Sequence, residues 1–138
     1  NDLDFYIDKA GLNAENYYGL ASDILKNMRP NRFDGELDLE KGVAFLGFET
    51  RISGDRWNID VWWKNQAEIN DSKAFADDMV HRMREKPELK NAVMRIKQDL
   101  ISLGLYGLDK GKKHYHSREI YRAVFLMGAL TTEQFLAL

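Results

Sequence analysis

The sequence contains no cysteine and only two prolines among its 138 residues. Without cysteine there can be no disulfide framework, no thiolate metal site and no thiol nucleophile. No apolar run approaches the length of about 18 residues that crosses a bilayer, and no basic-then-apolar leader opens the chain. A cysteine-free composition fits a reducing compartment. We therefore expect a cytoplasmic protein with no membrane partner.

An excess of charge of one sign is also lacking. Lysine and arginine number 20 against 22 aspartates and glutamates, which leaves a net charge of −2. This balance excludes a polycation, so any contact with nucleic acid must come from a local basic patch. The content of 44% hydrophobic and 30% charged residues is ordinary for a folded protein and argues against disorder.

The first half of the chain has the patterns of several strands and one helix. Residues 2–8 alternate strictly between polar and apolar side chains, which predicts a strand. Apolar residues recur every three or four residues over 14–28, which predicts an amphipathic helix. The segments 43–52 and 56–63 predict an antiparallel hairpin, because Ser-Gly-Asp between them forms a turn. The segment around Asp34 and Gly35 is expected to be a polar loop.

The second half is helical in pattern. Apolar stripes and capping residues predict helices over about 72–85, 87–103 and 118–127. The order of elements predicts an α+β fold class, with a small mixed β-sheet and its helices over residues 1–66. A helical section over residues 67–138 is expected to pack on it.

Paired carboxylates near the start of the chain are the first candidate for chemistry. Asp2 and Asp4 point to the same side of the predicted strand, about 6.6 Å apart. Two carboxylates in this arrangement repel each other and suit a hard divalent cation. The structural alternative is a solvated strand edge.

A third carboxylate, Asp60, stands in the middle of a strongly apolar strand. A buried charge without a partner is costly, so we expect Asp60 to have one. A salt bridge to Arg51 or Lys64 is the structural explanation. The functional explanation places Asp60 beside Asp2 and Asp4, where the three could hold two Mg²⁺ (or Mn²⁺) ions about 3.5–4 Å apart. Asp60 would then also act as the general base for an attacking hydroxyl.

A basic segment, Lys110–Arg118, is the second candidate for binding. Lys112 and Lys113 could hold phosphate, and Tyr115 could stack on a base, which makes these three residues the predicted nucleotide-binding set. The alternative is a solvated cationic loop.

Two stretches resemble a known family. Asn1-Asp2-Leu3-Asp4-Phe5-Tyr6-Ile7 is similar to the acidic Asp-x-Asp strand of the nucleotidyltransferase (DNA polymerase β-like) superfamily. Asn58-Ile59-Asp60-Val61-Trp62 is similar to its later strand, which carries the third aspartate. The tail over residues 115–135 resembles the helical end of small bacterial nucleotidyltransferase-like proteins.

The resemblance implies transfer of a nucleotidyl group from a nucleoside triphosphate to an acceptor hydroxyl on a small molecule, an RNA or a protein. The family also has a Gly-Ser motif before its acidic pair, so an enzyme of this kind should carry that motif upstream of Asn1. One alternative is a non-catalytic interaction module, of antitoxin or immunity type, that binds a protein through the acidic sheet face. Another is an RNA-contacting domain that uses the basic segment, with steep salt dependence.

Overall fold

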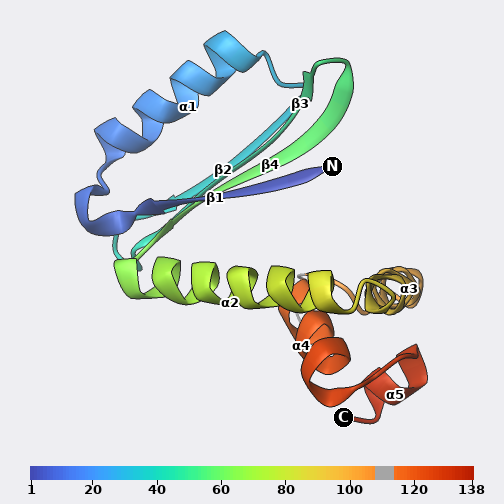
Figure 1. Ribbon diagram of the computed structural model, residues 1–138. Coiled ribbons are helices and arrows are strands. Elements are labelled where there is room, and N and C mark those ends of the chain that lie inside the picture. Colours follow the sequence, from blue (N-terminus) through green and yellow to red (C-terminus); the bar gives the residue numbers. More distant parts are fainter. Residues whose placement is uncertain (108–113) are drawn as a thin grey trace. The chain divides into compact units, whose positions relative to one another are not determined.

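The computed structural model describes residues 1–107 and 114–138 (Figure 1). The chain divides into two compact units, Asn1–Lys73 and Ala74–Leu138. We expected a division at residue 66, and the structure places it after residue 73. Among the described residues, no helix combines the length and apolar character needed to cross a bilayer.

The first unit contains a four-stranded sheet in the order β1-β4-β3-β2. Its strands are β1 (Asp2–Asp8), β2 (Arg32–Asp38), β3 (Val43–Ile52) and β4 (Asp55–Lys64). The pair β1 and β4 is parallel, whereas β3 pairs antiparallel with both β4 and β2. The sheet is therefore mixed, and with its helices it confirms the expected α+β fold.

The β3–β4 hairpin is confirmed, and its turn explains why the strands end where they do. Ser53 and Gly54 have φ angles of 53° and 91°, the backbone of a two-residue turn that matches the twist of the strands. Ile52 and Asp55 pair across this turn. The rest of the register follows from it residue by residue.

The expected loop around Asp34 and Gly35 is wrong, because this segment forms strand β2. Its polar residues alternate with Phe33, Gly35 and Leu37, and this alternation places the apolar set toward the core. Charged side chains on its other face suit an edge strand, because they discourage pairing with another chain.

Helix α1 (Ala14–Met28) lies along one face of the sheet, after a single 3₁₀ turn (Lys9–Gly11) (Figure 1). It begins where expected, because the Asn13 side chain accepts a hydrogen bond of 2.8 Å from the Asn16 N–H. It ends at Arg29, whose φ of 45° is left-handed and precedes Pro30.

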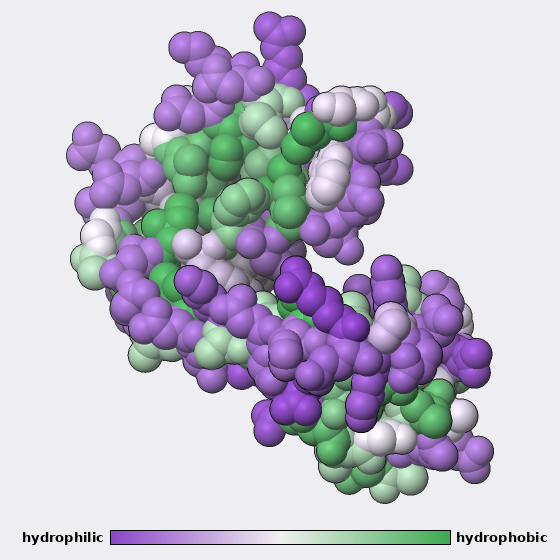
Figure 2. All heavy atoms as spheres, viewed as in Figure 1, coloured by the Kyte–Doolittle hydropathy of each residue, from purple (hydrophilic) through white to green (hydrophobic). Residues whose placement is uncertain are grey.

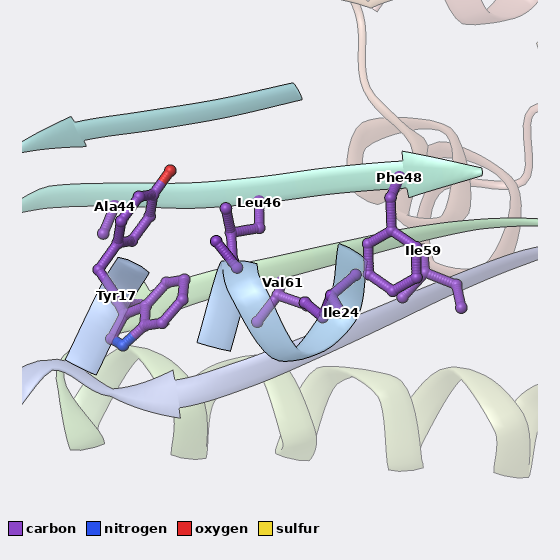
Figure 3. Close-up of a cluster of buried hydrophobic side chains, with 9 residues drawn as sticks. Tyr17, Ile24, Ala44, Leu46, Phe48, Ile59 and Val61 are labelled. Carbon is purple, nitrogen blue, oxygen red and sulfur yellow. The ribbon is translucent and has the colours of Figure 1, made fainter. Parts of the chain in front are cut away.

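The core of the first unit lies between α1 and the sheet. In Figure 3, Tyr17 and Ile24 of the helix lie against Leu46 of β3 and Val61 of β4. Hydrogen bonds to β3 hold both ends of the helix against the sheet. The Tyr17 hydroxyl donates to the Phe45 carbonyl at 2.9 Å, and the buried Thr50 hydroxyl donates to the carbonyl of Met28, also at 2.9 Å.

Helix α2 (Gln66–Glu85) begins six residues earlier than the sequence pattern suggested. Asn65 and Glu68 form a reciprocal cap in which each side chain accepts the other residue's backbone N–H at 2.9 Å. This capping box starts the helix directly after β4, so the expected start near residue 72 is wrong.

The second unit is helical, with α3 (Leu89–Ser102), α4 (Ser117–Met127) and α5 (Thr132–Leu136). Its core includes fully buried Ile96, Leu100, Ile120 and Val124, which lie at helical spacing on α3 and α4. The expected helices over 87–103 and 118–127 are confirmed to within two residues.

Candidate functional site

The three predicted carboxylates belong to two neighbouring strands of the first unit. Asp4 of β1 pairs directly with Asp60 of β4, and Asp2 pairs with Asn58. Their apolar neighbours on β4 are buried beneath α1, so alternation points the carboxylates to the opposite face of the sheet. The predicted adjacency of the three carboxylates is therefore confirmed, whereas their metal-binding and catalytic roles stay predictions.

Asp2 and Asp4 are exposed, whereas Asp60 is half-buried. The Asn58 side chain donates a hydrogen bond of 3.1 Å to Asp2 Oδ1, which orients that carboxylate. Among the described residues, no three acidic, histidine or cysteine side chains converge as a preformed metal site. The three carboxylates thus share a face of the sheet without closing around one point.

Asp60 is the electrostatically unusual member of this set. Burial raises its pKa, and the negative charges of Asp4 and then Asp2 raise it further, while the charge of Arg32 lowers it. These are the effects expected of a carboxylate that has lost water and gained like-charged neighbours.

A glycine lets the Phe45 ring lie close to Asp60. Gly47 lies directly opposite Asp60 on β3. A Cβ atom at Gly47 would stand 2.6 Å from Cζ of Phe45 and 3.2 Å from Asp60 Oδ1. The Phe45 ring therefore occupies the space above Gly47, beside the carboxylate. A glycine inside a strand often marks this kind of close approach.

The structural explanation for Asp60, a salt bridge to Arg51 or Lys64, is wrong. Arg51 Nη1 donates to the Gly54 carbonyl at 3.3 Å, and Lys64 Nζ lies 4.6 Å from the centre of the Tyr6 ring. Within the described part of the chain, Asp60 forms no ion pair. Its carboxylate instead faces the negative charges of its neighbours.

The structure describes one of the three predicted nucleotide-binding residues, Tyr115. Lys112 and Lys113 lie outside the described residues. Tyr115 belongs to the second unit, where its N–H donates to the Leu105 carbonyl at 2.8 Å. Its ring meets Phe135 edge to face, with centroids 4.9 Å apart. Tyr115 therefore helps to pack the helical core.

A groove of about 330 Å³ lies on the other face of the sheet, between α1 and β2. Tyr18 and Leu25 of the helix and Phe33 and Leu37 of the strand line it. Figure 2 shows hydrophobic residues gathered between α1 and the sheet. The groove is separated from Asp60 by the sheet, so it is not part of the carboxylate site.

Sequence reasoning identified Trp62 on the face of Asp60 but missed two other side chains near the carboxylates, Phe45 and Arg32. Phe45 and Trp62 pair across β3 and β4 one side-chain repeat beyond Asp60, and Arg32 lies on the strand that was expected to be a loop. Gly47 was the available signal for the Phe45 contact. The chain matches no family model, no curated protein and no solved structure in the comparisons.

Proposed function

We propose that the protein is a metal-dependent nucleotidyltransferase that moves a nucleotidyl group from a nucleoside triphosphate to an acceptor hydroxyl. The observation that carries the proposal is the parallel register of β1 and β4, which sets Asp4 beside Asp60 with Asp2 one side-chain repeat away. The resemblance of both strands to the acidic strands of that superfamily supports it. The expected cytoplasmic location would supply nucleoside triphosphates.

Three carboxylates on one face of the sheet are donors whose chemistry suits Mg²⁺ or Mn²⁺. Carboxylate oxygens are the ligands that these hard cations prefer, and like charges that raise the pKa of Asp60 favour a cation between them. Asp2, Asp4 and Asp60 would hold the metal, which supplies charge stabilisation to the phosphoryl oxygens when bound.

Asp60 is assigned the second role of general base. The acceptor oxygen attacks the α-phosphorus and forms a P–O bond while the bond to the β-phosphate breaks. Pyrophosphate leaves with the electron pair, and Asp60 takes the hydroxyl proton. A carboxylate with a raised pKa is better suited to accept that proton near neutral pH than an ordinary one.

Calorimetric titration of the gene product with a nucleoside triphosphate, with and without Mg²⁺, tests the proposal. Asp4→Ala should abolish metal-dependent binding, because it removes the carboxylate opposite Asp60. Asp34→Ala is the matched control. Asp34 lies on the same face of the sheet, but its Oδ2 forms an ion pair with Arg32 Nε at 3.1 Å. Equal binding by wild type and Asp4→Ala would refute the assignment. Absence of binding to the folded protein would instead favour an interaction module that recognises a protein through this face.

A further inference from the structure

A row of aromatic side chains lies beside the carboxylates on the same face of the sheet. Tyr6 of β1 pairs with Trp62 of β4, and Trp62 pairs with Phe45 of β3. The Phe45 and Trp62 rings have centroids 4.3 Å apart, and Lys64 Nζ lies 4.6 Å from the centre of the Tyr6 ring. We call Tyr6, Trp62 and Phe45 the aromatic row.

The aromatic row is separate from the hydrophobic core. Val61 and Trp63, which flank Trp62 on β4, are buried under α1 on the opposite face. Tyr6 retains 39% of its surface exposed, and Trp62 and Phe45 are half-buried. Aromatic residues on the face of a four-stranded sheet are a known means of stacking nucleobases, because every base offers a flat π surface.

The distance to the carboxylates suits a mononucleotide. The aromatic row lies one side-chain repeat, about 6.6 Å along the strands, from Asp4 and Asp60. In a nucleotide, one ribose separates the α-phosphate from the base. Phosphates held at Asp4 and Asp60 would therefore leave the base within reach of Trp62.

We propose that the aromatic row stacks the base of the nucleoside triphosphate. This inference rests on the proposed function, because it takes the carboxylates as the place where the phosphates are held. The spacing favours a single nucleotide over a nucleic-acid strand, because the base and the α-phosphate of one nucleotide can span the distance of about 6.6 Å between the aromatic row and the carboxylates.

The test compares two ligands in the presence of Mg²⁺: a nucleoside triphosphate and inorganic tripolyphosphate, which lacks the base. Trp62→Ala should weaken binding of the nucleotide roughly 5-fold to 150-fold, the loss of one stacked base. Its affinity for tripolyphosphate should not change. Trp62→Phe, which keeps an aromatic face, should retain most of the affinity. Trp57→Phe is the control, since Trp57 lies on the α1 side of the same strand.

The outcomes separate this inference from the proposed function. If both ligands bind equally to the wild type and Trp62→Ala changes neither affinity, the stacking inference fails while the proposed function survives. If neither ligand binds, both proposals fail. If an oligonucleotide binds more tightly than the nucleotide and depends on Trp62, the face recognises a strand and the inference is overturned. Tyr6→Ala, at the exposed end of the row, provides a second variant should Trp62→Ala fold poorly.

Discussion

Replacing Asp60 by asparagine should stabilise the protein at neutral pH while removing its proposed activity. The substitution keeps the size and shape of the side chain and removes one negative charge. In the wild type that charge is half-buried and lies directly opposite Asp4. Neutralising it relieves both the loss of hydration and the repulsion that raise its pKa.

The distance between Asp4 and Asp60 sets the size of the expected stabilisation. Paired residues on neighbouring strands lie about 4.8 Å apart. Two unit charges at this distance repel by about 0.8 kcal/mol in water and about 3 kcal/mol at an effective dielectric constant of 20. Because both carboxylates reach solvent, screening places the repulsion near the lower limit, at about 1 kcal/mol. The midpoint of thermal unfolding should rise by about 2–8 °C.

The effect has a defined dependence on pH. Because the folded state raises the pKa of Asp60, ionisation is easier in the unfolded chain, and the wild type loses stability as pH rises through the folded pKa. The gap between Asp60→Asn and wild type should be largest at neutral pH and should vanish below the ordinary aspartate pKa of about 3.9. Unfolding curves at several pH values measure this gap directly.

Asp34→Asn is the matched control for charge. Asp34 lies on the same face and pairs with Arg32, so its neutralisation should not stabilise the protein. The reasoning is refuted if Asp60→Asn is less stable than wild type at neutral pH, because Asp60 would then be held by a favourable partner. Added Mg²⁺ should also raise the unfolding temperature of the wild type more than that of Asp60→Asn, since the ion binds the folded state.

Two further predictions concern the scaffold around the site. Gly35→Ala should cost about 1–3 kcal/mol in chemical denaturation, because its Cβ would lie 2.5 Å from the Tyr17 hydroxyl and displace it from its hydrogen bond. Gly19→Ala, in open space on α1, should instead gain about 0.5–1 kcal/mol, and an equal loss at both sites would contradict this account. Asn65→Ala should cost about 1 kcal/mol and speed amide hydrogen exchange in the first turn of α2; unchanged protection there would show that its reciprocal cap with Glu68 is not needed.

Local patterns predicted those elements whose determinants lie close together in the sequence. The turn at Ser53 and Gly54 fixes the β3–β4 hairpin, and Asn13 starts α1 where expected. Strand β2 was missed because its pairing with β3 is set in three dimensions, and because charged residues and Gly35 within it resemble a loop. The start of α2 could have been read from Asn65, whose capping box is complete in the sequence.

The same distinction between local and long-range determinants applies to the candidate site. Alternation alone predicts that Asp2 and Asp4 share one face of β1. It also assigns Asp60 to one face of β4, but it does not say whether the two faces coincide. The three carboxylates share a face because two segments 56 positions apart pair as neighbouring strands, which the functional interpretation of Asp60 assumed and local sequence could not determine. The structure adds that the two strands are parallel. The packing of the Phe45 ring over Gly47, near Asp60, depends on ring orientation and could be found only in three dimensions.

The position of Asp60 argues against a purely structural role. An asparagine would fill the same space between Trp62 and Asn58 without the repulsion from Asp4, and no described cation within ion-pair distance offsets its charge. A residue that lowers stability where an isosteric alternative would not is expected where function requires its charge. The aromatic row extends this reasoning, because its rings lie on the same face, one side-chain repeat from Asp60 and Asp4. Ion binding by the carboxylates together with base stacking on the row would use both features with a single ligand.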